Sequence, residues 1–435
     1  MGEQGVNRSG QRNIFWYMVF SALRGASTAF SIVLWVVFLQ QVHGFNLTQV
    51  TLLDIPFWLG RFLFEIPTGI VADRYGRRFS LAVSSVLCGI IWLVFAVTNS
   101  FALFAVAQFF GALAATFSTG ADESLLFESL QGLSRKEEYA KISGRAKAVE
   151  TVTAMVSGVL IGLVASIDMI LPLILSAALC FATLLPILSM HETVQVQGQH
   201  GAAGTIRTVK AEFASYLIII RKAWRNLSEQ QILLWSALYM VVLGAVSFYA
   251  STFIQPYAVS LGVTVAAMGP VMVSLQLMSI AGSLSIHRAQ KLFGNRVILF
   301  GVPLLLIPCM AAVALIRMMP VLSVVALSSF LFALTQPVIM AIIQERVADE
   351  TRATFLSIQS VLSMGFLILT EPVMGFLSDL KGVHFSYLVM AALMAVFAVL
   401  LLTRGRRWLA AHRPDNPVPS ETDGRGAGSF SALDG

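Results

Sequence analysis

The chain has 435 residues, of which 57% are hydrophobic and only 12% are charged, and its net charge is +6. Soluble domains carry about 25% charged residues, so this composition excludes a soluble globular protein and predicts that lipid surrounds most of the chain. The three cysteines, Cys88, Cys180 and Cys309, lie in apolar stretches with no CxxC pair, so neither a disulfide nor a metal site is expected.

The apolar stretches, taken in chain order, predict an all-α membrane protein. A helix needs about 20 apolar residues to cross the ~30 Å hydrocarbon core, and the first stretch is too long for the core of a signal peptide. Six stretches precede a long polar segment: 14–39, 47–72, 79–98, 101–127, 148–166 and 170–189. Six follow it: 232–254, 264–286, 297–316, 320–344, 354–378 and 384–403. We therefore predict twelve transmembrane helices in two six-helix bundles.

The polar segments divide the chain into an N-terminal segment, a first bundle, a linker, a second bundle and a tail that we expect to be disordered. Their bounds are 1–13, 14–190, 191–231, 232–403 and 404–435. Within the linker, 211–224 suits either a helix on the membrane surface or a linker helix without lipid contact. Two glycine pairs share a spacing of 213 residues, as a repeat of the first bundle in the second would give: Gly69 with Gly282, and Gly162 with Gly375.

Basic residues fall almost entirely on one side of this predicted topology. Of the 29 lysines and arginines, 25 lie in the loops and tails on the side that carries both termini. Only Arg317 and Lys381 lie on the opposite side. The positive-inside rule assigns the basic side to the cytoplasm. We therefore expect a multi-pass protein of the plasma (inner) membrane with both termini cytoplasmic.

The loop after the second predicted span carries the decapeptide GIVADRYGRR, residues 69–78. It resembles the signature of the major facilitator superfamily at the same loop, G-x-L-[AG]-D-[RK]-x-G-R-[RK], with Val71 in place of leucine. The resemblance implies the fold of that family and a drug-efflux-like transporter that works by alternating access. Antiporters of the family usually carry a Gly-Pro element in the fifth span. Here Gly158 and Gly162 are kept without the proline, which leaves both directions of transport open.

The glycines and the aspartate of this decapeptide suit a gate between the bundles. Gly69 permits close approach of another helix, and Gly76 permits a tight turn. Asp73 is placed to accept hydrogen bonds from the start of the eleventh span, near 352–354. The same spacing recurs at the end of that span, in Gly375, Asp379 and Gly382.

The basic residues of the decapeptide have two possible roles. Arg77 and Arg78 can pair with Glu128 at the foot of the fourth span, or they can anchor the loop to anionic lipid. A lipid anchor alone requires neither the glycines nor the aspartate, so we favour the gate. The expected gate residues are Gly69, Asp73, Arg74, Gly76, Arg77, Arg78 and Glu128.

Ionisable side chains inside the spans are a second functional signal. Placing one at the bilayer centre costs ~3 kcal/mol on insertion scales, so each needs a partner or a water-filled cavity. By the resemblance, all of them lie on spans that line the central cavity of the family fold. The residues expected to line a cavity for substrate and proton are Arg24, Asp54, Arg61, Glu65, Asp122, Glu123, Glu150, Gln276, Gln336 and Glu371.

Some of these charges have obvious partners. Arg61 and Glu65 are spaced four residues apart on one helix, which suits an ion pair. Arg24 can pair with Asp122 or Glu123 on the fourth span. For these residues a structural salt bridge and a functional role are both open.

Two carboxylates, Asp54 and Glu371, have no obvious basic partner. A carboxylate in an apolar cavity favours its protonated form, so we expect these two to carry protons during transport. The excess of carboxylates over arginines suits a cationic or amine-bearing substrate. Aromatic residues of the seventh span either offer surface to an amphipathic molecule or simply pack against neighbouring helices: Trp235, Tyr239, Phe248 and Tyr249.

We therefore predict a secondary active transporter that exports small amphipathic or cationic compounds in exchange for protons. A proton-coupled importer of a small metabolite is the alternative, and a non-transporting membrane sensor is a weaker one. The sequence contains no HExxH, GxSxG or P-loop motif, so we expect no enzyme, cofactor or metal. The expected partners are a small-molecule substrate, a coupling proton and the lipid bilayer, without nucleic acid.

Overall fold

The computed structural model describes residues 3–191, 231–346 and 349–405, and within these ranges every regular element is a helix. Most of the predicted linker and tail lies outside them. The first half contains α1 (Glu3–His43), α2 (Leu47–Tyr75), α3 (Arg77–Val97), α4 (Phe101–Ser118), α5 (Ala121–Gly132), η1 (Lys136–Glu138), α6 (Tyr139–Ala165), α7 (Leu171–Ala182) and α8 (Leu184–Ser189). The second half contains α10 (Gln231–Ser260), α11 (Val265–Leu315), η2 (Met319–Val321), α12 (Leu322–Arg346), α13 (Asp349–Lys381) and α14 (Val383–Thr403).

These helices supply the predicted number of membrane spans. Within the described ranges, ten helical segments are long and apolar enough to cross a membrane, and α2 adds one more as two pieces that meet at 50°. The helix α11 has 51 residues, about 76 Å at 1.5 Å per residue, which is more than twice the hydrocarbon thickness. Gly294 interrupts it with φ 73° and ψ 159°. Dividing α11 there gives twelve spans.

Several helices begin outside the predicted hydrophobic stretches. The helix α1 starts at Glu3, α6 starts at Tyr139 and α13 starts at Asp349. Hydropathy reports only the part of a helix that lipid surrounds, whereas the backbone ladder continues into polar sequence. The tight turn predicted at Gly76 is present, since this residue joins α2 to α3 with a φ of 96°.

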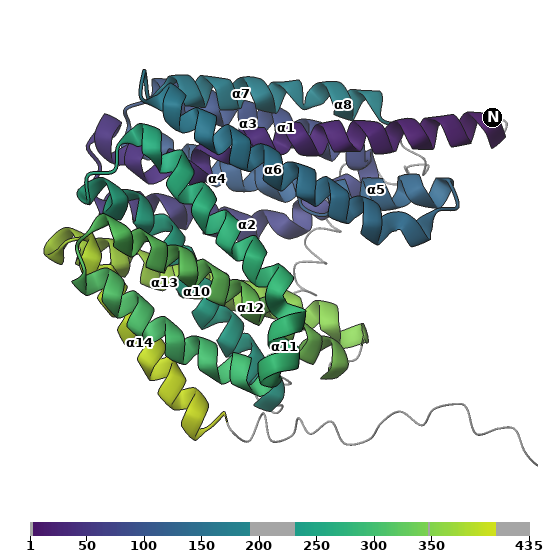
Figure 1. Ribbon diagram of the computed structural model, residues 1–435. Coiled ribbons are helices and arrows are strands. Elements are labelled where there is room, and N and C mark those ends of the chain that lie inside the picture. The colour runs from purple at the N-terminus through teal and green to yellow at the C-terminus, as the bar shows by residue number, and fades with distance from the viewer. Residues whose placement is uncertain (1–2, 192–230, 347–348, 406–435) are drawn as a thin grey trace, which may run out of the picture.

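The helices form two bundles, α1–α8 and α10–α14, which lie one above the other in Figure 1. We call the end where α1 begins and α14 ends the terminal side, and the opposite end the far side. In Figure 1 the terminal side is on the right, and the bundles converge on the left.

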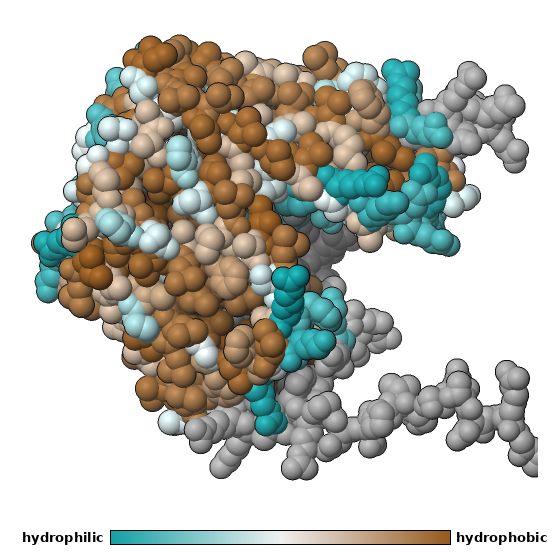
Figure 2. Space-filling view, in the orientation of Figure 1, coloured by the Kyte–Doolittle hydropathy of each residue, from teal (hydrophilic) through white to brown (hydrophobic). Residues whose placement is uncertain are grey.

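The outer surface of both bundles is apolar. Exposed aliphatic side chains cover it, for example Val97, Leu160, Leu284 and Val396, and Figure 2 shows broad hydrophobic areas on the visible face. Lipid is the only solvent that leaves such a surface stable, and each helix satisfies its own backbone hydrogen bonds in it. Polar function is therefore left to the space between the bundles.

The backbone at Gly294 allows a test of the division of α11. Its φ and ψ lie in a region open essentially to glycine alone, so Gly294→Ala costs about 1–3 kcal/mol. We expect the midpoint of thermal unfolding of the purified protein to fall by several degrees. The matched control, Gly301→Ala, adds a methyl group inside the helix at 3.9 Å from Val297 and should leave the midpoint unchanged.

Candidate functional site

The two bundles touch each other through glycines on the far side. A Cβ added to Gly162 near the end of α6 would lie 3.0 Å from the carbonyl oxygen of Ala266 at the start of α11. A Cβ added to Gly269 would lie 2.5 Å from the carbonyl oxygen of Gly158. The helices α6 and α11 therefore meet backbone against backbone, closer than larger side chains allow.

A glutamine from the second bundle reaches into a helix of the first on this side. The Gln255 side-chain oxygen accepts a hydrogen bond from the Val36 amide, and its nitrogen donates to the Ile32 carbonyl, both at 3.0 Å. An uninterrupted α-helix joins these two backbone groups to each other. Gln255, only 3% exposed, thus inserts its amide between successive turns of α1, a recognised cause of helix bending.

On the terminal side the bundles are separated. A Cβ added to Gly69 on α2 or to Gly144 on α6 would have no atom within 4 Å. The Asp73 carboxylate, 68% exposed, pairs at 2.7 Å with Arg77 of its own bundle. The space-filling view in Figure 2 is hollowed between the bundles on this side. The contact predicted between Asp73 and 352–354 stays a prediction, because the side chains there lie outside the described ones.

Two of the three arginines of the decapeptide, Arg77 and Arg78, hold different elements. Arg77 approaches Glu128 at 3.6 Å, which is the pair expected from the sequence. Arg78 donates hydrogen bonds to the carbonyl oxygens of Ile187 and Leu188 at 3.1 and 2.8 Å. Arg78 therefore caps the C-terminus of α8, a favourable place for a cation, and ties α3 to it.

Two connected hollows lie between the bundles. One of about 930 Å³ is lined mainly by the first bundle, the other of about 570 Å³ is lined mainly by the second, and Phe248 and Ser251 border both. Six of the predicted residues line the first hollow: Arg24, Asp54, Arg61, Asp122, Glu123 and Glu150. Gln276 and Gln336 line the second. Among the described residues, every charged one that lines these hollows belongs to the first bundle.

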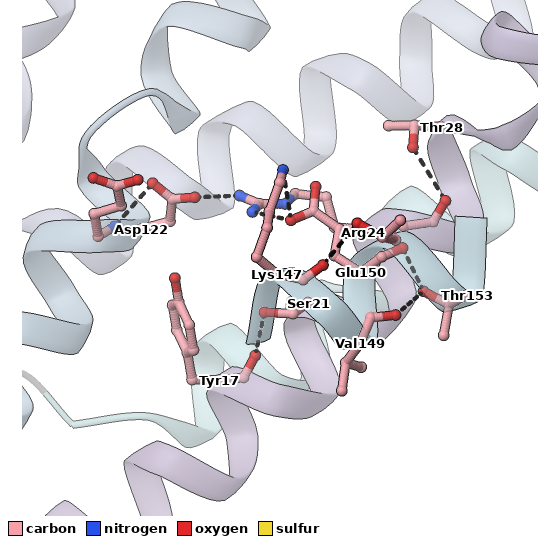
Figure 3. Close-up of polar contacts among 12 residues, drawn as sticks. Tyr17, Ser21, Arg24, Thr28, Asp122, Lys147, Val149, Glu150 and Thr153 are labelled. Carbon is pink, nitrogen blue, oxygen red and sulfur yellow. Dashed lines mark hydrogen bonds and ion pairs between the residues drawn. The ribbon is translucent and has the colours of Figure 1, made fainter. Parts of the chain in front are cut away.

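Figure 3 shows how Arg24 from α1 is held by two acids. Its guanidinium pairs with Asp122 of α5 and, at 2.9 Å, with Glu150 of α6. Lys147 adds a contact to Glu150 at 3.3 Å. The partner is thus Asp122 rather than Glu123, together with Glu150, for which the sequence indicated no partner.

The break between α4 and α5 explains this choice of partner. The helix α5 starts at Ala121, so Asp122 and Glu123 lie in its first turn, where acids are favourable. Asp122 is buried while Glu123 is exposed to the hollow. Because α1, α5 and α6 all belong to one bundle, the Arg24 cluster braces the first bundle and does not join the two.

A second carboxylate site does join the bundles. Glu371 of α13 is 1% exposed, and its Oε2 accepts a hydrogen bond from Trp58 Nε1 of α2 at 3.2 Å. Asp54, one turn earlier on α2, lies within hydrogen-bonding reach of Glu371, and Gln108 of α4 donates to it at 3.2 Å. The buried Glu371 Oε1 has no hydrogen-bond donor among the described residues. Two carboxyl groups in contact require a proton between them, because two carboxylates repel.

The expected ion pair between Arg61 and Glu65 is not formed within the described ranges. Arg61 lines the first hollow, whereas Glu65 is exposed and lies outside its lining. Both residues lie before the 50° bend of α2, on the piece Leu47–Glu65, so their helical spacing is kept and only the directions of their side chains differ. Arg61 is left facing the hollow without an ion pair in this part of the chain.

The aromatic residues of the seventh span divide between cavity and core. Phe248 borders both hollows, and its ring meets that of Trp58 at 5.6 Å in a T-shaped contact. The other three are buried in the hydrophobic core: Trp235, Tyr239 and Tyr249. Only Phe248 is therefore placed to contact a bound molecule.

Sequence reasoning missed three polar residues of this region. Gln108 and Gln255 are single amides in apolar helices, and Lys147 lies one turn before Glu150. A signal was present for Gln255, because Gln255–Pro256 has the same Gln-Pro sequence as Gln336–Pro337 in the tenth span. Polar residues in a membrane helix are costly unless they have a partner, so each isolated amide was a candidate.

The comparisons with known proteins agree with this architecture. Residues 17–370 match the family model of the Major Facilitator Superfamily. The chain belongs to this superfamily. Secondary structure, span number and the two-bundle arrangement are those of an MFS protein.

Individual relatives are distant. Over 105 residues this MFS chain is 30% identical to YxaM, an uncharacterized MFS-type transporter of Bacillus subtilis (strain 168). The match covers 24% of the chain and 26% of YxaM, so it spans about a quarter of that relative's length.

Solved MFS structures share the fold. The nucleoside transporter NupG superposes with a TM-score of 0.70 at 14% identity, covering 90% of this chain and 98% of that one. A bacterial homologue of the human lysosomal transporter Spinster, inward-facing and occupied, gives 0.68 at 14% identity, covering 91% and 97%. A D-xylose–proton symporter gives 0.66 at 12% identity, covering 90% and 97%. These identities establish the fold alone.

The Arg24 cluster predicts a charge-dependent stability. Arg24→Gln leaves Asp122 without its cation and Glu150 with Lys147 alone, and breaking a buried pair by removing one partner costs up to about 3–5 kcal/mol. We expect a clear fall in the thermal midpoint and recovery of part of it in Arg24→Gln/Asp122→Asn, where Glu150 still has Lys147. If the double variant is no more stable than the single one, Arg24 does not act by pairing with Asp122.

Proposed function

We propose that this MFS protein is a secondary active transporter that moves a small organic solute by alternating access and couples this movement to protons. The distribution of basic residues supports cytoplasmic termini, so that the terminal side faces the cytoplasm and the far side faces the exterior. In this orientation the structure is inward-facing. The far-side contacts at Gly162 and Gln255 close the outer path, and the separation at Gly69 leaves the inner path open.

The observation that carries the proposal is the contact between Asp54 and Glu371. These are the two residues that the sequence singles out for proton transfer, and their carboxyl groups meet at the boundary between the bundles. A carboxyl pair in contact binds a proton as a unit. Trp58 donates to Glu371 Oε2 and Gln108 donates to Asp54 Oδ1, and these hydrogen bonds fix the two carboxyl groups in place.

The location of the pair links proton binding to conformation. Asp54 lies on α2 and Glu371 on α13, which belong to different bundles. Rocking of the bundles changes the separation of the two carboxyl groups, and with it the number of protons that the pair binds. A ligand that binds two conformations differently shifts the equilibrium between them, and the proton is such a ligand here.

The residues that line the hollows favour an amphipathic substrate, with a cationic or amine group at one end and an apolar surface at the other. The first bundle contributes four carboxylates and three cations to the lining, and Glu371 lies behind this wall. A carboxylate excess of this kind favours a cationic or amine group. Trp58 and Phe248 add an aromatic surface. Export of a small amphipathic or cationic compound in exchange for protons is our first proposal.

A second candidate is proton-coupled import of a neutral polar solute. The wall of the second bundle carries uncharged hydrogen-bonding groups: Ser247, Ser251, Gln276, Ser279, Ser329, Thr335 and Gln336. The fifth span lacks the proline usual in antiporters, and two of the structures with this fold are titled a nucleoside transporter and a D-xylose–proton symporter. These observations favour import of a hydroxyl-rich solute.

The two candidates are separated by a binding screen followed by transport. Purified protein is heated with uridine, D-xylose or ethidium, which represent a nucleoside, a pentose and an amphipathic cation. The compound that raises the thermal midpoint is then tested in proteoliposomes under a pH gradient or a sodium gradient. Accumulation driven by sodium and indifferent to pH contradicts proton coupling.

The carboxyl pair gives a sharper prediction. Glu371→Gln removes the acid that shares the proton, so we expect accumulation driven by a pH gradient to fall at least about ten-fold, the effect of losing a proton-transfer group. Exchange of labelled for unlabelled substrate without a gradient should persist. Glu137→Gln, an exposed residue of η1, serves as the matched control and should retain both activities. Gradient-driven accumulation at the parental level in Glu371→Gln would refute the assignment.

A further inference from the structure

A carboxylate of the second bundle binds the N-terminus of α2 on the far side. Asp379, near the end of α13, accepts hydrogen bonds from the backbone amides of Leu47 and Thr48 at 2.9 and 2.8 Å. It also accepts one from the Thr48 hydroxyl at 2.5 Å. A negative charge at a helix N-terminus interacts favourably with the helix dipole, so this contact is attractive in both charge and geometry.

The contact completes the first turn of α2. The first four backbone N–H groups of a helix have no partner within it. In α2 these are the amides of Asn46, Leu47, Thr48 and Gln49, and those of Asn46 and Gln49 donate to each other's side chains at 3.0 and 2.8 Å. The other two N–H groups are those bound by Asp379. The cap of α2 is therefore divided between the two bundles, and separating them exposes two backbone donors.

One turn before Asp379, Gly375 brings the two helices into direct contact. A Cβ added to it would lie 2.3 Å from Thr51 Oγ1 and 2.6 Å from the Leu47 carbonyl oxygen. No side chain fits there without moving α2 away from α13. Gly375 and Asp379 thus combine close packing with a charged hydrogen-bond acceptor on one face of α13.

The same arrangement of residues occurs at the other end of the molecule, where none of the described side chains of the second bundle contacts it. Gly375, Asp379 and Gly382 have the spacing of Gly69, Asp73 and Gly76. Gly69 has open space around it, and the Asp73 carboxylate is mostly exposed. In this conformation one set of residues bridges the bundles and the other does not, on opposite sides of the molecule.

We propose that Gly375 and Asp379 form a far-side latch that holds this protein open on the terminal side. Gly69 and Asp73 form its counterpart, which engages when the terminal side closes. Asp379 is exposed, and a charged contact at an exposed position is weak enough to release. This inference rests on the proposed alternating access, but not on proton coupling or on the identity of the substrate.

Cysteine accessibility tests the latch without a substrate. The background protein has its three cysteines, Cys88, Cys180 and Cys309, replaced by serine. Ser251 borders both hollows, so Ser251→Cys supplies the single thiol whose labelling is measured. A membrane-impermeant maleimide is applied to the far side of oriented vesicles. We expect Asp379→Asn to raise the labelling rate about three- to ten-fold, the population shift that a charge–dipole contact of this kind supports. Gly375→Val should also raise the labelling rate, because the added side chain forces α2 away from α13 without changing a charge.

Two further variants make the result specific. Asp73→Asn weakens the opposite latch and should lower the far-side labelling rate. Asp168→Asn is the matched control, because Asp168 also accepts a backbone hydrogen bond on the far side, from Ile170 at 2.7 Å, but within the first bundle. Its labelling rate should equal that of the parent.

Each outcome bears on the proposal. Parental labelling in Asp379→Asn, or an equal rise in Asp168→Asn, overturns the latch. If Asp379→Asn fails to reach the membrane, Thr48→Val removes one of the three donors and must still raise labelling. If Glu371→Gln abolishes pH-driven transport without changing the labelling rate, the result supports the proposed proton coupling. The latch proposal is tested separately, by the labelling rates alone.

Discussion

Hydrocarbon supplies no hydrogen bonds, and this constraint governs where every polar group of the protein lies. A buried cation such as Arg24 is found between two acids, and the amide of Gln255 is taken up by the backbone of α1. Glu371 meets another carboxyl group at the bundle boundary. The outer surface is left to aliphatic side chains, so the space between the bundles is where charged chemistry and solute binding are possible.

The contacts that close the far side share one property, which is that they involve backbone groups. Gly162 and Gly269 place main chain against main chain, Gln255 binds a carbonyl and an amide of α1, and Asp379 binds two amides of α2. Backbone groups are fixed in a rigid helix, so such contacts form together or not at all. A cooperative closure of this kind suits a molecule with two discrete conformations.

Much of this architecture was predictable because lipid imposes strong local rules. Hydropathy located the twelve spans, and the decapeptide at 69–78 indicated the family. The sequence offered Asp122 or Glu123 as the partner of Arg24, and the structure selects Asp122. The break that turns Asp122 inward and Glu123 outward was not predictable, because it depends on the start of α5.

Contacts between segments that are distant in the chain could not be predicted from the sequence. Asp54 and Glu371 were singled out separately, yet nothing in a single sequence shows that residues on α2 and α13 meet. The insertion of Gln255 into α1 is likewise a tertiary event, decided by how the helices α1 and α10 cross. Which side is open is a property of the conformation and not of the pattern of residues.

The confinement of the Arg24 cluster to one bundle has a consequence for the whole cycle. Its ion pairs move together as a rigid body, so the electric field they impose on a bound solute stays constant while the bundles rock. The variable part of the field arises at the seam where Asp54 faces Glu371. In the proposed transport cycle, a solute therefore senses the change of conformation mainly through a single acidic contact, and this proposal separates selectivity and energy transfer onto different walls of the same chamber.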